Sequence, residues 1–193
     1  MEIRRYEPKD EKSWVRCRVL SFLDTAYFDN VLRQKEHYEN PSIELVAVNE
    51  GKIVGLLDAE YDTPDNRICT REPDKGAMIW HIAVHPDYQR EGVGGKLLLE
   101  LEKLAKELDI AYIKAWTRDD NWVRNWYEKN KFILTSSYLH VFLERDELSS
   151  ITTSHKNMQL IQGWAHYTGE NKLAIKEKYK RVHECVCYEK KLS

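Results

Sequence analysis

The chain of 193 residues lacks the features that would direct it to a membrane or to a nucleic acid. It has no apolar run long enough to cross a bilayer, and its first residues contain no apolar centre of a signal peptide. Its 30 basic and 32 acidic residues leave a net charge of −2, which argues against a dedicated nucleic-acid binder. We therefore expect a cytoplasmic protein that binds neither a membrane nor a nucleic acid.

Cysteine is also scarce, with four residues at irregular spacing, which favours reduced thiols over a disulfide framework. Cys185 and Cys187 are separated by one residue, but no second pair of Cys or His residues has a matching spacing. Zinc sites need such a second pair. We therefore expect no metal site and interpret Cys185-x-Cys187 as the alternation of a strand.

Hydrophobic residues make up 42% of the chain and charged residues 32%, which is sufficient for a packed core and argues against disorder. Apolar periodicity predicts helices over residues 10–21, 27–36, 92–108 and 122–130. Residues that favour strands occupy 2–6, 43–49, 52–61, 77–84, 111–116, 132–144 and 182–189. Since consecutive strands pair before the helical crossovers begin, we expect a mixed α/β sheet that is not doubly wound.

Three of the eight glycines, Gly92, Gly94 and Gly95, stand at the start of the most amphipathic helical segment. Glycine destabilises a helix by about 1 kcal/mol relative to alanine, so their position needs an explanation. The first N–H groups of a helix lack partners and carry partial positive charge, and glycine lets a pyrophosphate approach them closely. Arg90 and Lys96 can add charge. The pattern predicts a phosphate site, with a glycine-rich turn before a frayed helix as the alternative.

The segment IAVHPDYQREGVGGKLL, residues 82–98, resembles the acetyl-CoA site of the GCN5-related N-acetyltransferase (GNAT) superfamily. Gln89, Gly92 and Gly94 match the family pattern Q/R-x-x-G-x-G/A. The resemblance implies the acyl-CoA N-acyltransferase fold, which has a mixed, mostly antiparallel sheet with a central splay and helices on both faces. It also implies that acetyl-CoA is the cofactor and that its contacts include Ile82, Ala83, Val84, Gln89, Arg90, Glu91, Gly92, Val93, Gly94, Gly95 and Lys96.

A second segment, NWVRNWYEKNKF at residues 121–132, resembles the Tyr-Glu-Lys-x-Gly-Phe ending of the same family. Tyr127 falls on the tyrosine that often protonates the departing thiolate and also touches the cofactor. Asn121 lies near an asparagine that often contacts the cofactor, although one residue short of the commonest spacing. Lys131 replaces the usual glycine, and we expect Asn130 to adopt the left-handed conformation in its place.

The resemblance implies transfer of an acetyl group to a primary amine, on either a small molecule or a protein or peptide. Met78 stands where histone-type members carry a glutamate, so the general base is open between His81 and Glu60. A base that acts through water, or no dedicated base, is equally compatible with the sequence. On the acceptor side we expect Asp24, Tyr27, Trp116 and Asp119, for which helix junctions, packing or capping are the alternatives.

A typical family member joins its last two strands tightly, but in this chain about residues 145–181 intervene. The insertion predicts a small hairpin around Gln162-Gly163 and a charged helix over residues 170–179. It can cover the acceptor site, extend the sheet, form a homodimer contact or serve as a plain structural extension. We expect a single domain over residues 1–193, either an N-acetyltransferase or a catalytically silent domain that binds acyl-CoA or regulates another protein.

Overall fold

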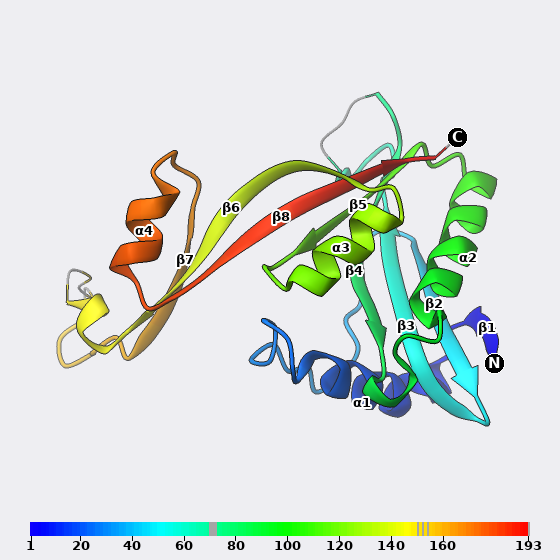
Figure 1. The fold of residues 1–193 in the computed structure, drawn as a ribbon, viewed down its shortest axis with the longest axis horizontal. Helices are drawn as coiled ribbons and strands as arrows, with labels where there is room; N and C mark the ends of the chain where they lie inside the picture. The colour runs from blue at the N-terminus through cyan, green and yellow to red at the C-terminus, as the bar shows by residue number, and fades with distance from the viewer. Residues whose placement is uncertain (70–72, 150, 152, 154, 193) are drawn as a thin grey trace.

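The computed structural model of the protein describes residues 1–69, 73–149, 151, 153 and 155–192. Its strands are β1 (Glu2–Arg5), β2 (Ser42–Asn49), β3 (Lys52–Tyr61), β4 (Gly76–Val84), β5 (Tyr112–Thr117), β6 (Ile133–Glu144), β7 (Gln162–Tyr167) and β8 (Arg181–Lys191). Its helices are α1 (Glu11–Phe22), α2 (Val93–Glu107), α3 (Asn121–Lys129) and α4 (Lys172–Lys178), with short 3₁₀ turns η1 (Pro8–Asp10), η2 (Pro86–Tyr88) and η3 (Arg145–Leu148). The strands form one sheet in the order β1-β2-β3-β4-β5-β8-β6-β7 (Figure 1).

The sheet is mostly antiparallel, as expected, and its parallel pair is β4 with β5. That pairing runs from Gly76↔Tyr112 to Ile79↔Ala115, whereas β4 continues to Val84 and β5 to Thr117. The two strands therefore separate beyond Ile79, which is the central splay. At the same position β4 has a β-bulge. Asp58 and Ala59 of β3 pair with His81 and Ile79, so Trp80 between them has no partner in β3.

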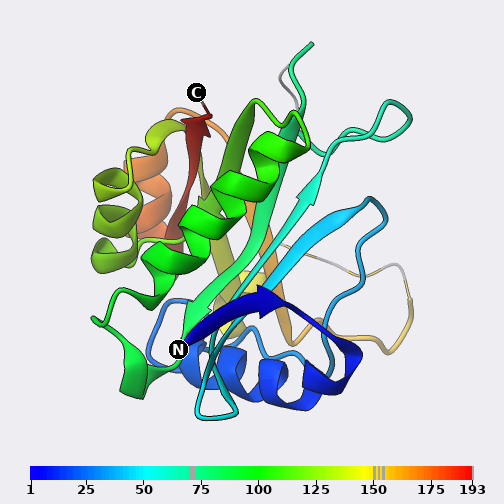
Figure 2. The same cartoon turned by 90° about the vertical axis from the view of Figure 1, so that its right-hand side faces the viewer.

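Helices cover both faces of the sheet, as expected (Figures 1 and 2). On one face, Leu97, Leu98 and Leu101 of α2 are fully buried in a cluster that includes residues of β2, β3, β5 and β8. Burial of one leucine side chain stabilises the fold by about 1.5–3 kcal/mol. On the other face, Trp14 and Cys17 of α1 pack in a second cluster with residues of β2, β3 and β4. The separated ends of β4 and β5 therefore lie in a sheet that is covered by α2 on one face and by α1 on the other.

The helix expected over residues 27–36 is wrong, because this segment forms turns and irregular stretches. Its side chains bond to several distant elements. Asn30 accepts hydrogen bonds from Arg18 of α1, and the Lys35 ammonium lies 2.8 Å from the Asp58 carboxylate of β3. A single straight helix could not reach these partners together, so tertiary contacts override the local helical preference.

The small hairpin expected around Gln162-Gly163 is also wrong. Both residues open β7, which pairs with β6 in the register Gln162↔Glu144 and Gly163↔Leu143. The long β6 offers an edge to β7, and Leu139 and Val141 of β6 form a separate apolar cluster with Leu148 of η3 and Ile175 of α4. The insertion thus extends the sheet and carries the expected charged helix, α4, away from the body of the molecule (Figure 1).

The expected conformation at the end of α3 is wrong as well. Lys131 itself adopts the left-handed conformation with φ of 66°, whereas Asn130 has φ of −88°. The Asn130 side-chain amide instead donates to the Trp126 carbonyl at 2.8 Å. The left-handed turn directs the next residue, Phe132, into the core, where it is buried. A lysine in this conformation destabilises the chain by about 1–2 kcal/mol relative to glycine.

Candidate functional site

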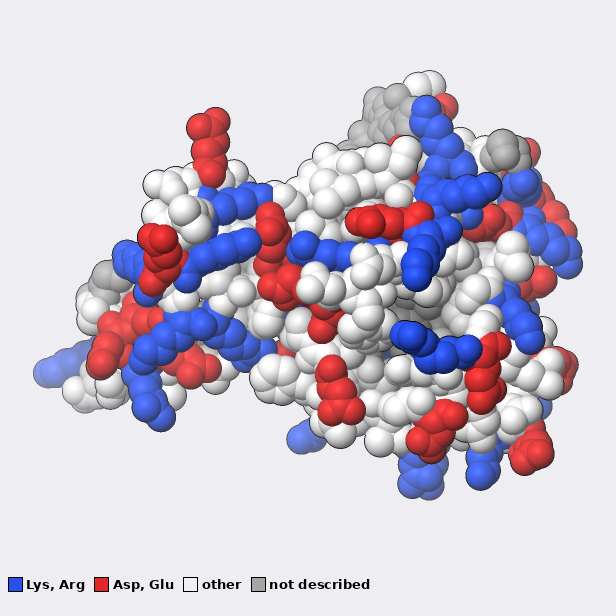
Figure 3. Space-filling model, viewed as in Figure 1, with Lys and Arg blue, Asp and Glu red and all other residues white. Residues whose placement is uncertain are grey.

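The separation of β4 from β5 opens a cleft of about 970 Å³. Its walls come from the end of α1 and the following loop, from the outer half of β4, from the start of α2, and from β5 and α3. Figure 3 shows basic and acidic side chains interspersed over the viewed face, so that face has no broad region of one sign. The chemistry of the site must therefore come from individual groups in the cleft.

The start of α2 forms a glycine cradle, by which we mean Gly92, Gly94 and Gly95, all of which line the cleft. Gly92 is the N-cap in the left-handed region, with φ of 80°, and no side chain caps the helix. A Cβ added at Gly92 or Gly95 would meet no other atom within 4 Å. The first amides of this 15-residue helix therefore face open space with the positive end of the dipole behind them, which fits a diphosphate.

Most of the expected cofactor contacts meet in this cleft, and a minority do not. The residues that line it are Ile82, Ala83, Val84, Gln89, Arg90, Gly92, Val93, Gly94, Gly95 and Tyr127. Glu91, Lys96 and Asn121 are exposed and are not among the lining residues. On α3 the lining residues are instead Trp122, Val123, Asn125, Trp126, Tyr127 and Lys129. The sequence reasoning missed those neighbours of Tyr127, although the helical spacing of Trp122 and Trp126 was visible.

Tyr127 is buried, and its ring is stacked on Tyr188 with ring centroids 5.2 Å apart. Phe132 packs edge-on against the same ring. The Tyr127 hydroxyl has no hydrogen-bond partner among the residues that the structure describes. Burial, with smaller effects of Tyr27 and Tyr188, raises the pKa of Tyr127 above its ordinary value. The phenol is therefore protonated at neutral pH and free to donate into the cleft.

His81 of β4 lines the cleft and is bonded on both sides of its ring. The Arg18 Nε–H donates to His81 Nδ1 at 3.3 Å, so the ring proton lies on Nε2 and is donated to Glu36 Oε2 at 2.6 Å. The hydrogen bond from His81 lowers the pKa of Glu36, which is half exposed. Sequence reasoning missed Glu36, and no local signal identifies it, because only the tertiary fold brings it to His81.

Glu60 does not line the main cleft. It lines a neighbouring cavity of about 420 Å³ that also contains Glu36 and is separated by Trp80, whose side chain borders both spaces. The Glu60 carboxylate accepts hydrogen bonds from the Asn40 backbone N–H at 2.8 Å and from the Trp80 indole at 2.7 Å. Both oxygens therefore have partners, one of which is the indole of Trp80 at the bulge of β4.

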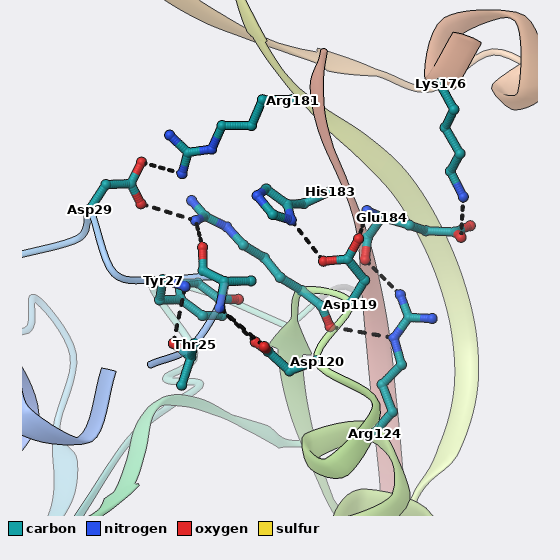
Figure 4. A network of polar contacts seen from close by, with 12 residues as sticks. Thr25, Tyr27, Asp29, Asp119, Asp120, Arg124, Lys176, Arg181, His183 and Glu184 are labelled. Carbon is teal, nitrogen blue, oxygen red and sulfur yellow. Dashed lines mark hydrogen bonds and ion pairs between the residues drawn. The ribbon is translucent and has the colours of Figure 1, made fainter. Parts of the chain in front are cut away.

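Of the four residues expected on the acceptor side, Tyr27 and Trp116 line the cleft, whereas Asp24 and Asp119 do not. Asp119 instead accepts from the backbone N–H of Glu184 and lies 2.8 Å from the Nδ1 atom of His183 (Figure 4). Burial raises the pKa of Tyr27 to about 12.

The loop after α1 is held against β5 and β8 by a network of polar contacts (Figure 4). The Ala26 backbone N–H is shared between the two carboxylate oxygens of Asp120, at 3.0 and 3.1 Å. Asp29 pairs with Arg118 at 3.2 Å and with Arg181 at 2.7 Å. These contacts hold the Tyr27 ring against the Arg118 guanidinium. The loop after α1 thereby forms one wall of the cleft.

No group of His, Cys, Asp and Glu in the described part of the chain has the arrangement of a metal site, and the four cysteines are buried free thiols. No helix there is both long enough and apolar enough to span a membrane.

Comparison with known proteins gives a consistent result. A sequence model of the acetyltransferase (GNAT) family matches residues 9–132. The ribosomal-protein-S18-alanine N-acetyltransferase of Escherichia coli has a TM-score of 0.60 at 16% identity, over 100% of this chain and 94% of that chain. The PaiA N-acetyltransferase of Thermoplasma acidophilum, solved with coenzyme A, has a TM-score of 0.54 at 18% identity, over 69% of this chain and 90% of that chain. No curated protein matches the sequence. The fold expected from the sequence is confirmed.

Proposed function

Because the chain belongs to the acetyltransferase (GNAT) family, whose acyl donor is acetyl-CoA, we propose that it acetylates a primary amine in the cleft between β4 and β5. One observation carries this proposal: the glycine cradle, the unpaired Tyr127 hydroxyl and His81 all line the same cavity. A cleft of about 970 Å³, with walls from several helices and strands, favours a small acceptor over a protein surface.

The residues present fit the acyl donor. We assign its diphosphate to the amides at the start of α2, with Arg90 adding charge, and its pantetheine arm to the main chain of residues 82–84, where β4 has left β5. Backbone N–H groups near Ile82 or Val84 can stabilise charge on the thioester oxygen. Bound acetyl-CoA supplies an activated acetyl group, whose C–S bond breaks as the acceptor nitrogen forms a C–N bond.

Tyr127 is assigned as the acid that donates its proton to the departing thiolate. Its protonated hydroxyl has no competing acceptor among the described residues, and its ring is held by Tyr188 and Phe132. A proton delivered at this point accelerates such a step by about tenfold to a hundredfold, because a free thiolate leaves without obligatory protonation.

His81 is assigned as the base that takes the proton of the amine. Its Nε2 proton is held by Glu36, so Nδ1 is the nitrogen left to accept, and the Glu36 carboxylate stabilises the resulting imidazolium. An amine that reaches Nδ1 replaces the contact with Arg18, which is long, at 3.3 Å. Glu60 is the weaker candidate because both its oxygens are engaged outside the cleft.

Replacement of His81 by glutamine is expected to lower kcat/KM by about a hundredfold. The matched control is His85→Gln, since His85 lies on the following turn outside the cleft wall. If His81→Gln keeps the wild-type kcat/KM for thiol release, as His85→Gln should, His81 is not the base.

The proposed function is tested by thiol release from acetyl-CoA with polyamines, amino acids, aminoglycosides and peptides with free N-termini. We expect release with at least one class of small amine. Tight binding of coenzyme A without release for any amine would identify a catalytically silent domain. Release with peptides alone would identify a protein-modifying enzyme.

A further inference from the structure

Arg18 of α1 is a buried cation, 1% exposed, that lines the acceptor side of the cleft. Its guanidinium donates to His81 Nδ1 at 3.3 Å, to the Asn30 carbonyl at 2.8 Å and to Asn30 Oδ1 at 3.2 Å. It also lies over the Phe22 ring, 4.5 Å from the centroid. Each of these partners is neutral.

The other buried cations of the described chain are compensated differently. The Lys35 ammonium lies 2.9 Å from Glu44 and 2.8 Å from Asp58, and Arg118 lies 3.2 Å from Asp29. Among the described residues, no carboxylate lies within ion-pair distance of Arg18. The Glu36 carboxylate is connected to Arg18 only through His81, which is bonded to both residues. A buried charge is costly unless an opposite charge lies against it. Arg18 therefore favours an anion in the cleft.

The guanidinium also has donors to spare. Arginine carries five N–H groups, of which the contacts with His81 and Asn30 use the Nε–H and one on each terminal nitrogen. One N–H remains on each terminal nitrogen. A carboxylate that accepts from either of these N–H groups forms a charge-assisted hydrogen bond, which is stronger than a bond between neutral groups.

We propose that the acceptor carries a carboxylate that pairs with Arg18, so that the substrate is a small amino acid or a similar amino carboxylate. This inference rests on the proposed function. A diamine is the competing class, because Glu36, Glu39 and Glu60 line the neighbouring cavity. Arg18 is the stronger determinant, since it lines the cleft that contains the cradle and Tyr127.

The experiment compares the common α-amino acids and 4-aminobutanoate with their carboxamides, and with butylamine and 1,4-diaminobutane. Binding is read from thermal shifts in saturating coenzyme A, and turnover from thiol release with acetyl-CoA. We expect at least one amino carboxylate to have a kcat/KM about thirtyfold or more above that of its amide, mainly through KM. Arg18→Gln should remove this preference, so that the amino carboxylate and its amide have similar kcat/KM values.

Two further variants keep the test decisive. Arg18→Lys retains the charge without the planar guanidinium and should retain part of the preference for the carboxylate. This variant also tests the inference if Arg18→Gln folds poorly. Arg16→Gln is the matched control, because Arg16 is exposed on the same helix. Equal binding of carboxylates and amides, or stronger binding of the diamine, would overturn the inference while acetyl transfer itself stands. Carboxylate-specific thermal shifts without any thiol release would support the Arg18 site and refute the proposed function.

Discussion

Replacement of Gly92 by valine is expected to weaken coenzyme A binding by about a hundredfold. Gly92 has φ of 80°, a conformation that a β-branched residue adopts only under strain of about 1–3 kcal/mol. A Cβ at this position meets no protein atom, so the fold does not clash with it. The strain instead turns the following amides of α2 away from the diphosphate, and the new methyl groups occupy space before the helix. Calorimetric titration with coenzyme A measures the loss.

The chain contains a matched control in Gly51, at the turn between β2 and β3. Its φ of 76° is nearly that of Gly92, and a Cβ there also meets nothing within 4 Å. Gly51→Val should therefore lower stability by a similar amount, about 1–2 kcal/mol, with normal affinity for coenzyme A. Equal affinities in the two variants would show that the cradle does not hold the diphosphate.

Replacement of Tyr127 by phenylalanine is expected to lower kcat by about tenfold to a hundredfold, with little change in affinity for coenzyme A. The variant keeps the ring that packs between Tyr188 and Phe132 and removes a hydroxyl that has no partner in the described structure. The melting temperature should therefore stay close to that of the wild type. Steady-state thiol release with a saturating acceptor measures the change.

Tyr188→Phe separates the role of the hydroxyl from that of the aromatic stack. Tyr188 is stacked on Tyr127, but its hydroxyl donates to Glu128 Oε1 at 2.9 Å and it is not among the cleft-lining residues. This variant should keep normal turnover. Wild-type kcat in Tyr127→Phe would mean that the thiolate leaves without a proton from this residue.

The sequence was most informative where the relevant residues are neighbours in the chain. The amphipathic helix over residues 92–108 and the glycine cradle at its start were both predicted, because each depends on local backbone preferences and periodicity. The expected position of Tyr127, one helix beyond the cradle, followed from a second local motif. The structure brings both to one cleft.

Predictions failed where distant contacts outweigh local preference. Residues 27–36 have helical spacing, yet Asn30 and Lys35 are drawn to α1 and β3. Gln162-Gly163 is a favourable turn sequence, yet the free edge of β6 pairs with it as a strand. At Lys131 the end of α3 imposes a left-handed residue before Phe132, whichever side chain stands there.

The sequence by itself determined the cradle, because the glycines that leave the start of α2 without side chains are near neighbours in the chain. Only the tertiary structure decided the acceptor side. His81 is 63 residues from Arg18 and 45 from Glu36, and nothing in the spacing of these residues indicates that one imidazole joins them. Backbone conformation depends on near neighbours, whereas the pairing of buried charges depends on which strands and loops the packing of the whole sheet brings together.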